Sequence, residues 1–138
     1  MRKSIAVLIV EDEPIIADDI ALSLEELGFE IDQIAASSEE ALNQLKVKKP
    51  DIVLLDIKIK GSEDGIRLGH HINQKYQIPF IYISSLYDQN TLARAKATNP
   101  SGYIVKPFKE SDLKVTIELA LSKQVNKQTE TNPDELNL

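Results

Sequence analysis

The chain alternates between short, wholly apolar runs and longer segments in which apolar residues recur at helical spacing. Residues 5–10 read IAVLIV, and similar runs occupy residues 52–55, 80–83 and 103–105, with a weaker run at residues 31–36. A short, unbroken run of apolar and β-branched residues is typical of a strand buried on both faces of a sheet. The pattern therefore predicts five strands.

Each predicted strand is followed by a helical pattern with recognisable ends. Apolar residues of the first helix recur every three or four positions and precede a glycine, a common helix stop; these are Ile16, Ile20, Leu24, Leu27 and Gly28. Ser37 and Glu40 have the spacing of a capping box and predict the start of a second helix, which Pro50 prevents from continuing. Further helices are expected over residues 64–76, from residue 88 or 90 to residue 99, and around residues 113–121.

This order of strand and helix, repeated five times, predicts the fold class. Right-handed crossovers place a helix between successive parallel strands, so the alternation favours a parallel sheet covered by helices on both faces. Five units are too few to close an eight-stranded barrel. We expect an α/β fold with an open, doubly wound, five-stranded parallel sheet. The 138 residues suit one domain over residues 1–124, and the polar residues 125–138 are expected to form a tail or the start of an interdomain linker.

Composition and charge narrow the classes of function. Hydrophobic residues make up 42% of the chain and charged residues 28%, as in a globular domain. The absence of cysteine excludes a disulfide framework, a thiolate metal site and a cysteine nucleophile. The net charge of −6 repels phosphate backbones and no basic patch offsets it, so we expect no nucleic-acid binding by this chain itself. No apolar stretch approaches the roughly 20 residues of a membrane span, and a signal-peptide pattern is lacking, so we expect a cytoplasmic location without membrane contact.

Polar or ionisable residues follow four of the five predicted strands. They are Glu11 and Asp12 after the first strand, Asp56 after the third, Ser84 and Ser85 after the fourth, and Lys106 after the fifth. The carboxyl ends of parallel strands meet at one edge of an open sheet, where the ligand of such a sheet binds. We therefore expect these side chains to share one pocket.

The chemistry of these groups indicates a phosphoryl site. Three carboxylates in one pocket repel one another unless a cation lies among them. Oxygen ligands without histidine or cysteine suit a hard ion, and a site with few carboxylates and room for water favours Mg²⁺, which commonly meets phosphate. Asp56 is then the expected nucleophile for an acyl phosphate. Lys106 supplies a positive charge to the phosphoryl oxygens, and Ser84 donates a hydrogen bond to one of them.

In their order and placement these motifs resemble those of the receiver domain of bacterial two-component response regulators. The resemblance covers residues 3–124 and depends on residues 7–13 (VLIVEDE), residues 54–57 (LLDI), Ser84 and residues 106–108 (KPF). It implies a flavodoxin-like (βα)5 fold with strand order 2-1-3-4-5. Such a domain is a signalling module that assists its own phosphorylation and dephosphorylation, rather than an enzyme.

The resemblance also implies roles for the residues of the site. Asp56 would take a phosphoryl group from a partner sensor histidine kinase. Asp12 would bind Mg²⁺ directly, Glu11 would bind it through water, and the backbone carbonyl of Lys58 would complete the protein ligands. Lys106 would pair with the phosphoryl group. The loop after Asp56 is one residue longer than is common in the family, and we hypothesise that Lys58 extends over the site and alters how water reaches the acyl phosphate.

A conformational switch and two contact surfaces follow from the same resemblance. Tyr103 matches the family's switch aromatic, whose ring turns inward when Ser84 moves towards the phosphate, and a cis peptide is common where this chain has Lys106-Pro107. The expected kinase-docking residues are Pro14, Ile15 and Asp18. Family members often form homodimers on phosphorylation through the face made by the fourth helix, fifth strand and fifth helix. The downstream output is expected to be transcription, and regulators with similar sequences carry a LytTR-type DNA-binding domain, which would lie outside this chain.

Other functions on the same topology need different residues. A haloacid dehalogenase-like aspartyl-phosphate phosphatase needs a second Asp two residues after the nucleophile, where this chain has Lys58. A flavin or nucleotide binder needs a Gly-rich turn after the first strand, where residues 11–14 read EDEP. A stand-alone receiver acting by protein–protein contact stays open. Neighbouring helix positions point about 100° apart, so His70 and His71 are expected to be solvated helix surface rather than joint metal ligands.

Overall fold

A computed structural model describes residues 4–85 and 88–129 of the chain, with side chains described as far as residue 123. The strands are β1 (Ala6–Val10), β2 (Glu30–Ala35), β3 (Ile52–Leu55), β4 (Phe80–Ser84) and β5 (Gly102–Val105). The helices are α1 (Pro14–Glu26), α2 (Ser38–Val47), α3 (Gly65–His71), the π-helical turn η1 (Ile72–Tyr76), α4 (Gln89–Lys96) and α5 (Glu110–Thr129).

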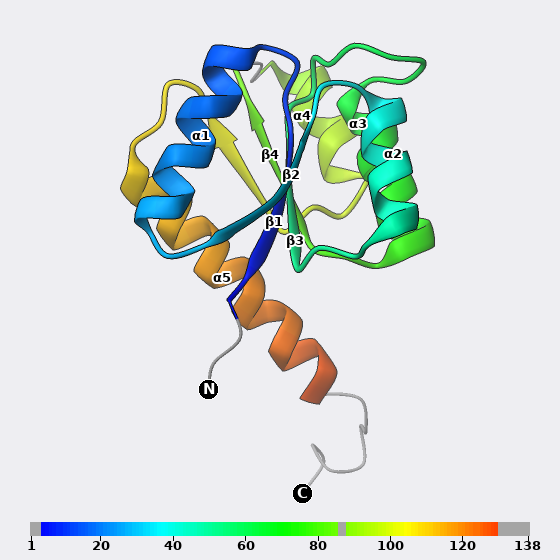
Figure 1. The fold of residues 1–138 in the computed structure, drawn as a ribbon. Coiled ribbons are helices and arrows are strands. Elements are labelled where there is room, and N and C mark those ends of the chain that lie inside the picture. The colour runs from blue at the N-terminus through cyan, green and yellow to red at the C-terminus, as the bar shows by residue number, and fades with distance from the viewer. Residues whose placement is uncertain (1–3, 86–87, 130–138) are drawn as a thin grey trace, which may run out of the picture.

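The strands form one parallel sheet with helices on both faces (Figure 1). The strand order is β2-β1-β3-β4-β5, so β1, β3 and β4 are the interior strands. The predicted fold class and strand order are confirmed. Strand β2 has the weakest apolar pattern because it lies at the edge of the sheet, where several of its side chains are exposed.

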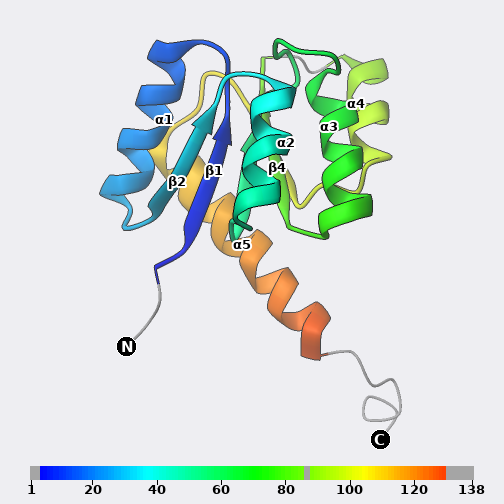
Figure 2. The same cartoon turned by 45° about the vertical axis from the view of Figure 1, so that its right-hand side comes forward.

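Alternate side chains of each interior strand enter two separate cores, which explains why their sequences are apolar up to Ser84, the last residue of β4. Val7 and Ile9 of β1 pack with α1 and α5, whereas Leu8 and Val10 pack with α2, α3 and α4. The helix layers lie on opposite sides of the sheet, as both views show (Figures 1 and 2). The sheet is thereby covered on both faces, and its carboxyl edge stays free for a site.

Side-chain caps set the starts of three helices. Ser37 accepts a hydrogen bond from the Glu40 amide at 3.1 Å, as the capping box predicts, but the Glu40 carboxylate accepts from the amide of Ala36 at 2.7 Å. Asp64 accepts from the Arg67 amide at 2.9 Å at the start of α3. The fourth helix is expected to start at residue 88 or 90, and Asp88 is the residue that caps α4, because its carboxylate accepts a hydrogen bond from the Thr91 amide at 3.1 Å.

The helix predicted over residues 64–76 changes character at its C-terminal half. It is α-helical as far as His71 and continues as the π-helical turn η1. The turn ends at Gln77, whose backbone is left-handed with φ 55°, and the Gln77 amide donates to the Ile72 carbonyl at 2.8 Å. The periodicity predicts the position of this segment but not the wider turn, because both helix types bury one face.

The last helix extends past the predicted end of the domain. A polar tail is expected from residue 125, but α5 continues to Thr129, and Figure 1 shows its C-terminal part projecting beyond the sheet. A helix that is already nucleated extends at little cost in free energy, even without tertiary contacts. The domain boundary at residue 124 stays a prediction, and residues 130–138 lie outside the described part of the chain. Within that part, no helix has both the length and the apolar character needed to cross a membrane.

Candidate functional site

Three charged residues from three strand ends meet at the carboxyl edge of the sheet. Glu11 follows β1, Asp56 follows β3 and Lys106 follows β5. The Lys106 ammonium lies 2.8 Å from Glu11 Oε1 and 2.8 Å from Asp56 Oδ2. Glu11 and Asp56 are both buried, at 3% and 8% exposure, so the lysine compensates charges that have lost most of their hydration. The cation that the carboxylates require is thus supplied in part by the chain itself.

One ammonium is shared by two carboxylates in this cluster, and the pKa values of Glu11 and Lys106 are both shifted. Burial raises the pKa of Glu11, and the nearby charge of Asp56 adds to this effect, while the hydrogen bond from Lys106 opposes it. For Lys106, burial acts to lower the pKa, but hydrogen bonds to Asp56 and Glu11 outweigh it and raise the pKa. The site therefore holds Lys106 charged and has capacity for further positive charge.

The second oxygen of Asp56 and the backbone behind it are also fixed. Oδ1 accepts a hydrogen bond from the Lys58 amide at 3.2 Å. Gly65, at the start of α3, donates its amide to the Ile57 carbonyl at 2.7 Å. A Cβ atom at Gly65 would lie only 2.0 Å from the Asp56 carbonyl oxygen, so only glycine permits this approach of α3 to the strand end.

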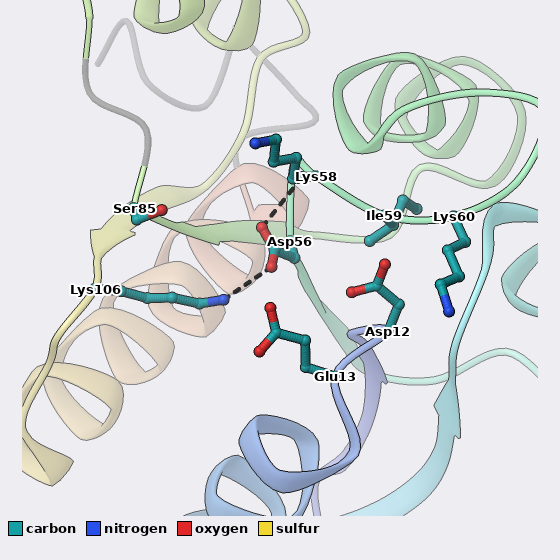
Figure 3. A pocket seen from close by; sticks show the side chains of 8 residues that line it. All are labelled: Asp12, Glu13, Asp56, Lys58, Ile59, Lys60, Ser85 and Lys106. Atoms are coloured by element: carbon teal, nitrogen blue, oxygen red, sulfur yellow. Dashed lines mark hydrogen bonds and ion pairs between the residues drawn. The ribbon is translucent and has the colours of Figure 1, made fainter.

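A pocket of about 270 Å³ opens above Asp56. It is lined by Asp12, Glu13, Asp56, Lys58, Ile59, Lys60, Ser85 and Lys106. Figure 3 shows the carboxylates of Asp12, Glu13 and Asp56 and the ammonium of Lys106 pointing towards one another, whereas the ammonium of Lys58 points away from them. The predicted convergence of the first, third and fifth strand ends is therefore present in the structure.

Several lining residues are not singled out by the sequence motifs. Glu13 is one, although its place next to Glu11 and Asp12 in the sequence could have indicated it. In the structure its amide donates a hydrogen bond to Glu11 Oε2 at 3.2 Å. Ile59 and Lys60 are others, and they enter because the loop after β3 folds over the pocket. The fourth strand contributes the exposed Ser85 rather than Ser84, which is 1% exposed and is absent from the described lining.

Ser84 and Tyr103, the predicted switch pair, lie together beside the pocket. Burial raises the pKa of the Tyr103 hydroxyl. A hydrogen bond between the side chains of Tyr103 and Ser84 acts against this rise but is the smaller influence. The Tyr103 ring is also 5.9 Å from the ring of Tyr82, centroid to centroid, at a tilt of 52°. The two residues predicted to form the switch are thus in contact with each other.

The donor chemistry of the pocket fits a hard divalent ion. Asp12 and Asp56 offer carboxylate oxygens, and the backbone carbonyl of Lys58 would be a third protein ligand. The Glu11 carboxylate is paired with the Lys106 ammonium. Within the described residues, no three acidic, histidine or cysteine side chains are grouped so as to hold an ion by themselves. Two carboxylates with a carbonyl and waters are a donor set that Mg²⁺ accepts, because this ion keeps much of its hydration.

The remaining predicted residues lie at the surface. Pro14, Ile15 and Asp18 are exposed on the first turns of α1, beside the pocket, and Ile15 is 80% exposed. Their side chains are therefore accessible to a partner protein. His71 lies in an exposed pair with Glu63, with Nδ1 and Oε1 2.8 Å apart, and His70 is exposed. The Lys106-Pro107 peptide is cis, as expected.

Comparison with known proteins gives a consistent result. Residues 7–118 match the family model described as the response regulator receiver domain. The chain is 38% identical over 117 residues to the transcriptional regulatory protein PdtaR of Mycobacterium tuberculosis, covering 85% of this chain and 57% of PdtaR. It is 31% identical over 134 residues to the sensory transduction protein LytT of Enterococcus faecalis, covering 94% of this chain and 52% of LytT. The chain thus spans little more than half the length of these relatives.

Solved structures share the same arrangement of strands and helices. The signal receiver domain of a modulated diguanylate cyclase from Desulfovibrio desulfuricans G20 has a TM-score of 0.85 at 34% identity, covering 91% of this chain and 99% of that one. A CheY-like response regulator receiver domain protein from Methanospirillum hungatei JF-1 has a TM-score of 0.83 at 25% identity, with the same coverage of both chains.

Proposed function

This chain belongs to the response regulator receiver domain family, and we propose that Asp56 is its phosphoacceptor, which takes a phosphoryl group from a sensor histidine kinase. The observation that carries the proposal is the position of the Asp56 carboxylate. It follows the central strand, lies at an open pocket and has one oxygen 2.8 Å from the Lys106 ammonium. A carboxylate in this setting is both accessible to a phosphodonor and electrostatically prepared for added negative charge.

The proposed step is a transfer of one phosphoryl group. An oxygen of Asp56 attacks the phosphorus atom, a P–O bond forms, and the bond to the donor breaks with its electron pair on the leaving group. The product is an acyl phosphate, whose added charge the Lys106 ammonium is close enough to compensate. Mg²⁺, held by Asp12, Asp56 and the Lys58 carbonyl and through water by Glu11, would neutralise charge on the phosphoryl oxygens.

We further propose that the acyl phosphate acts on the Ser84–Tyr103 pair. Their shared hydrogen bond means that a movement of Ser84 towards the phosphoryl group changes the surroundings of the Tyr103 ring. Tyr103 lies on β5, next to a surface of α4, β5 and α5. This surface exposes the apolar side chains Leu92, Val105, Val115 and Leu119. Because phosphorylation would change this surface, a homodimer or an effector contact made through it would depend on phosphorylation.

The output of the signal belongs to the whole protein. PdtaR is a transcriptional regulatory protein and LytT a sensory transduction protein, and both are nearly twice as long as the segment matched. We propose that this receiver controls transcription through an effector outside the present chain, with any DNA contact made by that effector. A stand-alone receiver that acts by protein contact is the alternative output.

Intact-mass measurement after incubation with acetyl phosphate and Mg²⁺ tests the proposal. We expect the mass of one phosphoryl group to be added to the wild-type chain and to Asp19→Asn, a matched change at an exposed site on α1. No addition is expected for Asp56→Asn. Turnover of many phosphate esters without a lasting adduct would instead indicate an aspartyl-phosphate phosphatase.

A further inference from the structure

The loop between β3 and α3 is fastened to the first turn of α2. The Ser38 amide donates to the Lys60 carbonyl at 3.0 Å, and the Ser62 amide donates to Glu39 Oε2 at 2.7 Å. The Ser62 hydroxyl donates to the same carboxylate oxygen. A weaker bond runs from the Glu63 amide to Ser38 Oγ at 3.4 Å. Four contacts between segments more than twenty residues apart in the sequence therefore hold this loop from its outer side.

Packing at this junction leaves no room for the loop to move towards α2. Ser38 is fully buried, and Gly61 has a backbone φ of 122°, which favours glycine. A Cβ atom at Gly61 would lie 2.3 Å from Ser38 Oγ and 2.5 Å from Glu39 Oε1. The loop thus lies directly against the helix, and the Glu39 carboxylate is positioned over its turn.

The same loop forms one wall of the phosphoryl pocket. Lys58, Ile59 and Lys60 all line the pocket, and the Lys58 amide donates to Asp56 Oδ1. The Lys60 carbonyl that accepts from α2 belongs to one of these lining residues. A displacement at the fastened end of the loop therefore reaches the Lys58 backbone, only a few residues away.

We propose that Glu39 is a positioning residue for the phosphoryl site: by holding the Ser62 turn, it fixes the loop that brings the Lys58 backbone carbonyl to the metal. The effect on the metal rests on the proposed function, whereas the contacts between Glu39 and Ser62 are present in the structure whatever that function is. Glu39 touches neither the pocket nor Asp56, so it acts through the loop alone. Hydrogen bonds from Ser62 lower the pKa of Glu39, which keeps the carboxylate charged and the contact charge-assisted at neutral pH.

The adjacent Glu40 provides a matched control. It lies on the same helical turn, and its carboxylate also accepts from a backbone amide at 2.7 Å, but that amide belongs to Ala36 in the cap of α2. Removing either carboxylate removes a similar hydrogen bond at the start of the same helix. Only the loss of Glu39 removes contacts to the loop, namely the two hydrogen bonds from Ser62, so the two variants separate positioning from helix stability.

Amide hydrogen exchange in the free protein tests the contact. We expect Glu39→Ala to speed exchange at Ser62, and Glu40→Ala to speed exchange at Ala36 while leaving Ser62 unchanged. Glu39→Gln keeps a carbonyl acceptor for the Ser62 amide and should restore most of the protection. An unchanged exchange rate of the Ser62 amide in Glu39→Ala overturns the proposal.

Titration of each folded variant with Mg²⁺, without any phosphodonor, tests the consequence. We expect Glu39→Ala to bind Mg²⁺ about tenfold more weakly than wild type, the scale of loss when a group that orients a metal ligand is removed. Glu40→Ala and Glu39→Gln should bind as wild type does. Equal affinities in Glu39→Ala and wild type overturn the positioning role, as does a wild-type chain that binds no Mg²⁺. A wild-type chain that binds Mg²⁺ but gains no phosphoryl group refutes the proposed function alone.

Discussion

The hydroxyl of Tyr82, in the middle of β4, lies 2.6 Å from Oγ1 of Thr98, just beyond the end of α4. The Tyr82 side chain is fully buried, and its ring packs edge-on against Phe80 and lies near Tyr103, its neighbour on β5. Thr98 Oγ1 also lies 2.6 Å from the carbonyl of Ala95. A buried polar contact therefore joins the interior strand β4 to the C-terminal end of α4, the helix that borders the proposed switch surface.

Loss of this contact should lower the stability of the fold. We expect Tyr82→Phe to reduce the free energy of unfolding by about 1–2 kcal/mol, because the buried Thr98 hydroxyl loses a partner. Urea denaturation measures the difference. Tyr76→Phe is the control, since the structure gives the Tyr76 ring a contact with Lys75 but no hydrogen bond of its hydroxyl within the described residues. Equal effects of the two changes would contradict the prediction.

The same tyrosine should make the fold sensitive to alkaline pH. Burial raises the pKa of Tyr82 from 10.0 to about 12. The unfolded chain therefore releases this proton at lower pH than the folded chain, so the contribution of Tyr82 is complete below pH 10.0 and is lost as pH rises to about 12. We expect the stability advantage of wild type over Tyr82→Phe to decline across that range, by an amount on the order of 2 kcal/mol. An advantage that stays constant up to the highest pH studied would show that the hydroxyl is not deprotonated on unfolding.

Gly65 should be required for the geometry of Asp56, the proposed phosphoacceptor. A methyl group at this position meets the Asp56 carbonyl oxygen at 2.0 Å, so Gly65→Ala must displace backbone at the end of β3. We expect a loss of about 1–3 kcal/mol in stability, together with slower phosphorylation of the folded fraction by acetyl phosphate. The readouts are urea denaturation and intact mass.

Gly28 is the matched control for this change. It has a positive φ of 93°, but a Cβ atom there would meet nothing within 4 Å. Gly28→Ala should therefore cost about 1 kcal/mol of stability through backbone strain and leave the phosphorylation rate unchanged. A slower rate in both variants would mean that the effect of Gly65→Ala is one of global stability.

Removal of Lys106 should destabilise the fold in a way that depends on pH. Lys106→Met leaves Glu11 and Asp56 without their shared cation, which we expect to cost about 3 kcal/mol at neutral pH, as for other broken buried pairs. The pKa of Glu11 is already raised in the folded state, so ionised Glu11 favours unfolding as pH rises above 4.5. The destabilisation by Lys106→Met should therefore be smaller at mildly acidic pH, where Glu11 is protonated. Lys109→Met, at an exposed lysine immediately before α5, should show no such dependence.

Lys58 should influence the lifetime of the acyl phosphate. Its ammonium points away from Asp56 in Figure 3, yet the residue lines the same pocket as Asp56. We expect Lys58→Ala to shorten the lifetime of the phosphorylated state severalfold, because a smaller side chain leaves the pocket more open. The decay of the added mass after removal of donor measures it. Lys46→Ala on α2 is the control, and an unchanged lifetime in Lys58→Ala would refute the hypothesis.

Features that depend on near neighbours in the chain were predictable from sequence. The caps at Ser37 and Asp64 are set by residues three positions away, and the strand at residues 5–10 by its own unbroken apolar run. The place of Asp56 at the carboxyl edge was predictable for a related reason: polar residues that follow parallel strands must come to one edge of the sheet. Family resemblance then indicated the strand order, which the structure confirms.

Contacts between distant segments were decided only by the tertiary structure. Lys106 lies between Glu11 and Asp56, which are 95 and 50 positions away, and the carboxylate of Glu39 closes the turn at Ser62. These pairs depend on how far each loop reaches and which rotamer the surrounding packing allows, and no periodicity in the sequence encodes either. The chain thus specifies its strands, its helix starts and the acids at its site by local chemistry. The partner of each acid is set by the packing of the whole fold, because the free energy of a charged contact depends on burial that only the complete structure provides.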